Sequence, residues 1–195
     1  NIQCRSSADV VITRVRLRDG SSGIHTWACP RVHVSFVEGY NFRGPFPRGQ
    51  VVQFGVSNDA TLEDFYTKND INVSWTEDNV NSWHSSNSTI RRGLVDGNNS
   101  RSGVGVIFEH AAVATGGLVE DVDAIRMGNG CFSAADAHNV TFRNVRCQQN
   151  LCGNVGGRGA SLSNSLMFNS YQNTLSDNIR YYSSTYNYSC NGNIA

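Results

Sequence analysis

The sequence feature that most constrains the fold is a repeat with a period of 22 to 28 residues. Each unit contains two short segments in which apolar and polar residues alternate, separated by a small or polar bend. Self-similarity with a period in this range is typical of solenoids, in which equivalent coils stack on one another. The first segments open at Ile2, Ile24, Val52, Val80, Val106 and Phe132, so that successive units are offset by 22, 28, 28, 26 and 26 residues.

The second segments support the same alignment. Their alternating residues end at Ile12, Val34, Leu62, Ile90, Val119 and Phe142. Three residues later there is again an apolar or small residue, namely Val15, Val37, Phe65, Gly93, Val122 and Val145. A period of two predicts strands, and the chain lacks the 3.6-residue apolar stripe of helical repeats. We therefore expect an all-β fold, a parallel β-helix of about six or seven rungs, whose core forms because each rung covers the next.

The repeat also predicts how the chain is divided. Rungs are clear over residues 2–147, and we expect residues 1–195 to form a single domain, since this length supports a sizeable core. Residues 148–195 are expected to form irregular last rungs and a C-terminal segment. A seventh unit is expected to start near Leu166, with its register open.

Several segments of the repeat resemble right-handed parallel β-helix proteins of the pectate-lyase-like superfamily, namely "HNVTFRNVRC", "NSTIRRGLVDG" and "GLVEDVDAIRMGNG". The resemblance covers most of residues 2–147 and implies a right-handed coil. It implies no single function, because this architecture hosts lyases, hydrolases, epimerases, adhesins and phage spikes. The N-T-D, D-D, G-H-G and R-I-K signatures of polygalacturonases and the Y-G-x-D-P-H signature of mannuronan epimerases are absent, so no catalytic residue is carried over.

Strand alternation predicts which side chains of the first segments reach the surface. The opening residue and the residue two positions later point inward, and the residues between and after them point outward. Indole faces stack on sugar rings, while amides, carboxylates and imidazoles orient hydroxyl groups. The sequence thus predicts a sugar-binding patch, unless long turns cover this face and bury the indoles. The predicted patch contains His25, Trp27, Gln53, Asn81, Trp83 and Glu109.

The turns before the first segments bring further charged residues to the same edge. Glu77 or Asp78 is expected to form an acid–base pair with Glu109. Arg48 is a candidate catalytic residue that could hold the carboxylate of an acidic sugar or lower the barrier to removal of the neighbouring proton. Arg43 and Glu77 are candidate binding residues.

His25 is suited to act as a base near neutral pH. For every one of these residues, the alternative is a solvated turn charge or a contact that stabilises the turn. His84 and His110 fall in an inward column and are expected to be core histidines.

Charge and composition argue against several classes of partner. The chain has 16 basic and 16 acidic residues, so it lacks the basic surplus of proteins that bind nucleic acid through phosphates or are anchored to membranes by charge. No apolar run approaches the length of a membrane span. No His, Cys or Asp cluster has zinc-ligand spacing, and a calcium site at Glu120, Asp121 and Asp123 is not favoured because neighbours alternate between faces. We therefore expect no cofactor and no metal.

The six cysteines favour disulfides and hence a secreted or periplasmic location. Cys147 and Cys152 are close enough in sequence to pair within a loop, but the sequence does not choose among the fifteen possible connectivities. The alternative is that several of the cysteines are buried free thiols.

Two hypotheses for the function follow. The first is an extracellular protein that binds a polysaccharide, with the question open whether it also acts on an acidic glycan as a lyase, hydrolase or epimerase. The second is a structural or adhesive subunit of an extracellular fibre, built from copies of the chain stacked end to end. It is motivated by the lack of an evident capping helix, since an uncovered strand edge invites a further strand.

Overall fold

The computed structural model describes residues 1–70, 72–98, 100, 103–109, 115–135 and 137–150, followed by short strand segments between residues 153 and 186. All regular elements in these residues are strands, and every strand pair is parallel. The first sheet contains β1 (Ile2–Arg5), β3 (Ile24–Trp27), β5 (Val52–Gly55), β7 (Val80–Trp83), β9 (Val106–Glu109) and β11 (Phe132–Ala135), in this spatial order.

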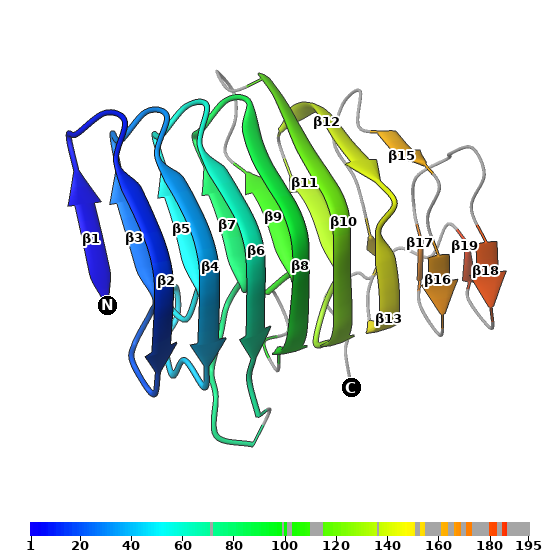
Figure 1. Cartoon of the computed structure of the whole chain (residues 1–195). Helices are drawn as coiled ribbons and strands as arrows, with labels where there is room; N and C mark the ends of the chain where they lie inside the picture. The colour runs from blue at the N-terminus through cyan, green and yellow to red at the C-terminus, as the bar shows by residue number, and fades with distance from the viewer. Residues whose placement is uncertain are drawn as a thin grey trace.

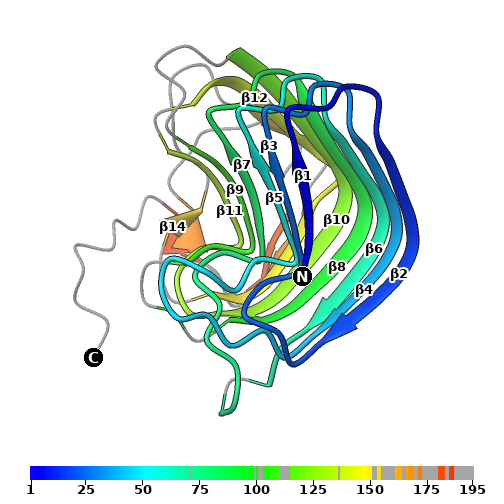
Figure 2. The ribbon, with the colours of Figure 1, turned by 90° about the vertical axis from the view of Figure 1, so that its left-hand side faces the viewer.

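The second sheet faces the first across the interior, and the strands from β1 to β12 alternate between the two sheets (Figures 1 and 2). Its main path runs through β2 (Val11–Arg18), β4 (His33–Tyr40), β6 (Thr61–Lys68), β8 (Ser88–Asn98), β10 (Thr115–Met127), β13 (Arg146–Asn150), β16 (Leu166–Phe168) and β18 (Arg180–Tyr182), while β12 (His138–Arg143) pairs with β10 and β15 (Ser161–Ser163). A small third sheet contains β14 (Gly153–Asn154), β17 (Tyr171–Gln172) and β19 (Thr185–Tyr186). The fold is thus a parallel β solenoid.

The strand register confirms the alignment of the repeat. In the first sheet Ile2 pairs with Ile24, Ile24 with Val52, and so on through Val80, Val106 and Phe132. In the second sheet the paired column contains Ile12, Val34, Leu62, Ile90, Val119 and Phe142, as the sequence predicts. Positions that are equivalent in the repeat are therefore neighbours in space.

The core is the space between the two sheets. The opening residues of the first-sheet strands from β3 to β11 are at most 1 % exposed, and so are the residues two positions later, which confirms the predicted inward columns. The second column contains Thr26, Phe54, Ser82, Phe108 and Ala134. Because these side chains stack on their equivalents in neighbouring coils, burial continues from β3 to β11.

Each coil bends at equivalent positions through residues with left-handed backbone. One such column lies at the middle of the long strands of the second sheet, at Arg14, Phe36, Asp64, Arg92, Asp121 and Asn144. Another follows the short strands of the first sheet, at Ser6, Ala28, Val56 and His84. Left-handed backbone costs roughly 1–2 kcal/mol for most residues. Most members are not Gly, Asn or Asp, so the stacking of coils, and not local preference, imposes the bend.

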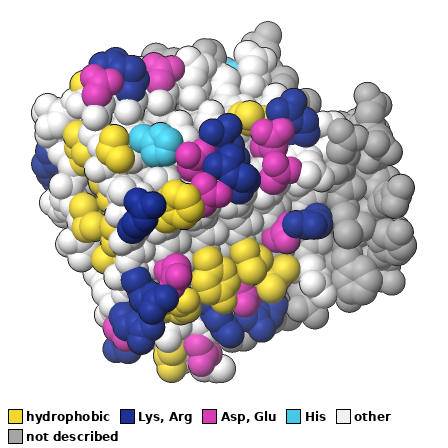
Figure 3. Space-filling view, in the orientation of Figure 1, with side chains coloured by type: hydrophobic (Ala, Val, Ile, Leu, Met, Phe, Trp, Pro, Cys, Tyr) yellow, Lys and Arg dark blue, Asp and Glu magenta, His cyan; other side chains and the backbone are white. Residues whose placement is uncertain are grey.

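On the outer face of the second sheet, basic and acidic side chains lie next to one another in clusters, with hydrophobic side chains between them (Figure 3). The most regular set is a register column in which the sign of the charge alternates, and we call it the charge column: Glu63, Arg91, Glu120 and Arg143. Arg91 Nε donates to Glu63 at 2.7 Å, and Arg143 Nε donates to Glu120 at 2.7 Å.

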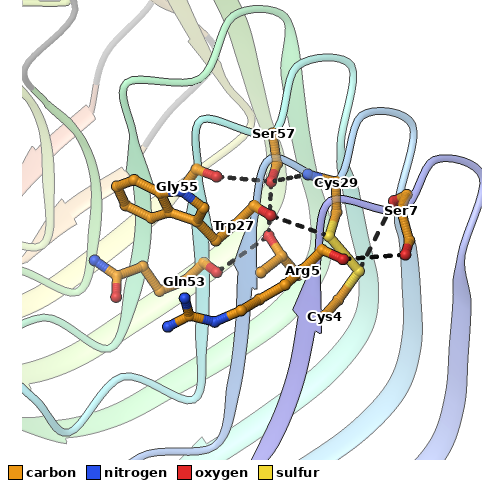
Figure 4. The surroundings of a disulfide bond; sticks show 9 residues. Cys4, Arg5, Ser7, Trp27, Cys29, Gln53, Gly55 and Ser57 are labelled. Carbon is orange, nitrogen blue, oxygen red and sulfur yellow. Dashed lines mark hydrogen bonds between the residues drawn. A yellow bond between two sulfur atoms is a disulfide. The ribbon is translucent and has the colours of Figure 1, made fainter.

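Two disulfides join parts of the described chain. Cys4 of β1 pairs with Cys29, which follows β3, and this disulfide links the first coil to the second (Figure 4). Cys131 pairs with Cys147 of β13, and this disulfide crosses from the first sheet to the second. The spacing of Cys147 and Cys152 would allow these two cysteines to pair, but Cys147 instead pairs with Cys131, at a Cα–Cα distance of 5.8 Å. Cys152 itself lies outside the described residues.

The end of the chain differs from the predicted seventh unit. Leu166 does not open a new strand of the first sheet, because it pairs with Arg146 and extends the second sheet. The remainder of residues 148–195, like His110, lies largely outside the described residues. Nowhere in the described part of the chain is there a helix long and apolar enough to cross a membrane.

Candidate functional site

A groove of about 400 Å³ lies on the outer face of the first sheet, between β3 and β9. Its floor is formed by strand residues that the register aligns, and one wall is formed by the segment between β4 and β5. The groove is lined by His25, Trp27, Phe46, Pro47, Arg48, Gln53, Glu77, Asn81, Trp83 and Glu109.

Two indoles form the middle of the groove floor. Trp27 and Trp83 belong to one register column, with Gly55 between them. Their strands are two steps apart, roughly 9.6 Å at about 4.8 Å per step. Their ring centroids are nevertheless only 5.3 Å apart, at an interplanar angle of 32°, because Gly55 leaves room for the rings to lean together. Trp27 remains 39 % exposed and Trp83 is half-buried, so the indoles are not sealed by the turns.

Three polar side chains are connected by hydrogen bonds at the β9 end of the groove. Asn81 Nδ2 donates to Glu109 Oε1 at 2.7 Å and to Asp78 Oδ2 at 2.9 Å. Asp78 Oδ1 accepts a hydrogen bond of 2.8 Å from the backbone amide of Val104. Asn81 is 1 % exposed, and its Oδ1 has no hydrogen-bond partner among the described residues. Asn81 thus holds Glu109 in place at the groove and ties it to the buried Asp78.

The environment of this acidic cluster favours bound protons. Burial raises the pKa of Asp78 well above its ordinary value, and the negative charges of Glu109 and Glu77 add to this effect. The Val104 amide and Asn81 oppose it only in part. Burial, followed by the charge of Glu109, likewise raises the pKa of Glu77, which lines the groove. A carboxyl that keeps its proton near neutral pH can serve as a general acid.

The opposite end of the groove is basic. Burial lowers the pKa of His25, and the positive charges of Arg48 and Arg5 lower it further, so its imidazole is neutral near pH 7 and can accept a proton. His25 is on β3 and Glu109 is on β9, which places three strand-to-strand steps between them. The two residues therefore do not form one acid–base pair.

The structure brings most of the predicted site residues together, with two exceptions. Arg43 does not line the groove, because its guanidinium pairs with Asp19 at 2.9 Å. Asp78 is 2 % exposed and lies behind Asn81, so that Glu77 and Glu109 are the carboxyl groups that line the groove. Phe46 and Pro47 were not predicted from the sequence, although they lie in the same turn as Arg48.

The prediction that His84 is a core histidine is wrong. His84 has a left-handed backbone, with φ of 49°, which breaks the alternation that pointed its side chain inward. It is half-buried, and its ring packs edge-on against Trp83 with a centroid distance of 4.1 Å. His84 thus supports one of the two groove indoles.

Within the described residues, no group of three or more His, Cys, Asp or Glu side chains is arranged to hold a metal ion. The groove itself consists of an indole pair, an acidic end and a basic end. No protein-family model and no curated protein matches this chain.

Proposed function

We propose that this protein binds a polysaccharide in the groove, with sugar rings stacked on the indoles of Trp27 and Trp83. The observation that carries the proposal is the exposed indole pair on the groove floor, flanked by amides and carboxylates. Aromatic faces pack on the C–H surface of a sugar ring, and fixed polar groups select the orientation of its hydroxyls. Gln53 supplies such an amide next to the indoles, and Asn81 fixes the carboxylate of Glu109.

The acidic end supports a chemical step on the bound glycan. Glu77, whose pKa is raised, is the candidate proton donor, and Glu109 is the candidate acceptor, held by Asn81. Asp78 is a positioning group in this proposal, because it contacts Asn81 and does not line the groove. A lyase, a hydrolase and an epimerase all need such a pair of proton-transfer groups.

Three finer properties belong to the same proposal. We infer a right-handed coil of six or seven rungs, which the six strands of the first sheet and the general handedness of parallel crossovers support. We infer a relationship to the pectate-lyase-like superfamily, which the similar segments within residues 2–147 support. The two disulfides support an extracellular or periplasmic location.

Binding can be tested with a panel of polysaccharides, including alginate, pectate, xylan and chondroitin, against the protein and its Trp variants. Trp27→Ala and Trp83→Ala are each expected to weaken binding roughly tenfold or more, as for other buried aromatic contacts. Trp75→Ala is the matched control, because Trp75 is 56 % exposed and lies outside the groove. Equal losses in all three variants would contradict the groove as the binding site.

Turnover is a separate measurement on the same panel, followed through unsaturated products or new reducing ends. We expect Glu109→Gln to abolish it while binding persists. Binding without turnover by the native chain would restrict the function to recognition. No binding to any glycan, together with polymers whose formation depends on protein concentration, would instead favour the fibre subunit.

A further inference from the structure

Most of the arginines whose side chains the structure describes already have a partner. Those with a carboxylate within 4 Å are Arg16, Arg31, Arg43, Arg91, Arg92, Arg126, Arg143 and Arg146. Arg14 and Arg18 lie over the rings of Phe36 and Tyr40. Arg5 and Arg48 have neither kind of partner among the described residues, and the charges of both act on His25 at one end of the groove.

A smaller and more enclosed cavity of about 140 Å³ adjoins this end of the groove. His25, Arg48 and Gln53 line both spaces, so the two lie side by side. The remaining lining residues are polar apart from Ile24 and supply amides and hydroxyls: Asn1, Gln3, Ser21, Ser22 and Gln50. Donors of this kind around a guanidinium without a counter-ion fit a small anionic group.

The strand register shows that opposite charges lie at the two ends of the groove floor. A single column runs from Arg5 through Trp27, Gly55 and Trp83 to Glu109. It places a cation at one end, the indole pair in the middle and a carboxylate at the other end. The four strand-to-strand steps span roughly 19 Å at about 4.8 Å per step, which is long enough for a short oligosaccharide. In Figure 4 the Arg5 side chain extends on the same side of the sheet as those of Trp27 and Gln53.

We propose that the cavity beside Arg48 is an anion subsite that receives the carboxylate or sulfate of one sugar of the bound glycan. This inference rests on the proposed function. The carboxylate of Glu109 at the opposite end repels a second anionic substituent there. The preferred ligand is consequently a glycan in which acidic and neutral sugars alternate or are mixed, bound with its acidic sugar toward β1 and its neutral sugar toward β9.

The test compares oligosaccharides that differ only in charge. The probes are a chondroitin tetrasaccharide, its carboxyl-reduced form, its sulfated form, and tetragalacturonate as a fully charged chain. Affinity is measured by calorimetry at low and at high salt. We expect the carboxyl-reduced form to bind about tenfold more weakly than the native tetrasaccharide, the value of a hydrogen bond to a charged group. The sulfated form separates sulfate from carboxylate recognition, and tetragalacturonate is expected to bind more weakly than the alternating chain.

Variants assign this preference to the cavity. Arg48→Gln is expected to remove the difference in affinity between the unmodified and the carboxyl-reduced tetrasaccharide. Arg14→Gln, on the outer face of the second sheet, is the matched control and is expected to keep the difference. Arg5→Gln is expected to reduce the difference in part.

The outcomes separate this inference from the proposed function. If the wild-type protein bound the unmodified and the carboxyl-reduced tetrasaccharide equally well, or preferred tetragalacturonate, the anion subsite would be overturned. Glycan binding in the groove would still stand. A charge preference that survives Arg48→Gln would also overturn it. Failure to bind any polysaccharide of the panel would overturn both.

Discussion

Trp27 and Trp83 contact each other across Gly55, although their strands are not neighbours in the sheet. The contact depends on a missing side chain. A Cβ at Gly55 would lie 2.9 Å from Cε3 of Trp27 and 3.0 Å from the carbonyl oxygen of Thr26. One glycine therefore converts two separate indoles into a continuous aromatic surface.

Gly55→Ala is expected to separate the two rings, because the added methyl group occupies the space into which Trp27 leans. Loss of the ring contact should cost about 1 kcal/mol of unfolding free energy and weaken glycan binding. Near-ultraviolet circular dichroism and chemical denaturation measure both changes. Ala135→Gly, at the far end of the same column, is the control. An unchanged near-ultraviolet spectrum in Gly55→Ala would contradict the role of Gly55.

Asp78→Asn is expected to change how stability depends on pH. Because the pKa of Asp78 is raised on folding, the native state binds a proton that the unfolded chain releases between the ordinary and the raised pKa. The unfolding free energy therefore falls as the pH rises through this interval. Asp78→Asn should be more stable than the native chain at pH 8 and similar to it near pH 4, as measured by urea denaturation.

Asp64→Asn is the matched control for this experiment, with the opposite sign. Hydrogen bonding by Arg92 lowers the pKa of Asp64, so this carboxylate stabilises the fold above its ordinary pKa, and its contribution is lost as the pH falls. Asp64→Asn should therefore lose stability at pH 8, whereas Asp78→Asn gains it. The same sign in both variants would show that burial of Asp78 carries no electrostatic cost.

Removal of either disulfide by paired Cys→Ala substitutions should lower the unfolding free energy by about 3 kcal/mol. The cysteines of the pairs are 25 and 16 residues apart, so chain entropy predicts a difference between the two of only about 0.4 kcal/mol. Peptide mapping without reductant should recover Cys4 with Cys29 and Cys131 with Cys147. Recovery of Cys147 with Cys152 would contradict the second pair.

Val56→Asn should raise the unfolding free energy by about 1 kcal/mol, because Val56 has φ of 50° and a β-branched side chain is strained there. Val56 is 42 % exposed, so little burial is lost. Val11→Asn is the control, since Val11 is 67 % exposed and is not among the residues with left-handed backbone. Equal effects of the two substitutions on thermal and urea denaturation would remove backbone strain as the cause.

The repeat predicted the sheet register residue by residue, because every coil places an apolar residue at the same point of its first strand. Alternation then indicated which side chains reach the groove, including Trp27 and Trp83. These features depend on a period of two and on the spacing of coils, and both are visible in a linear sequence.

Features that depend on turns were not predictable in this way. The burial of Asp78 depends on the amide of Val104, which approaches from the next coil. Arg43 lies in the same turn as Arg48, yet only the three-dimensional path of that turn brings it to Asp19. His84 does not point into the core, because its left-handed backbone reverses the direction of its side chain. No residue type near His84 predicts this bend.

The charge column on the second sheet has a consequence for the order in which the coils assemble. Glu63 lies beside Arg91, Arg91 beside Glu120, and Glu120 beside Arg143. If one coil were skipped during folding, Glu63 would face Glu120, or Arg91 would face Arg143, and like charges directly opposite are destabilising. The apolar residues that open the first-sheet strands are nearly interchangeable between coils, whereas this row of charges disfavours the omission of a single coil.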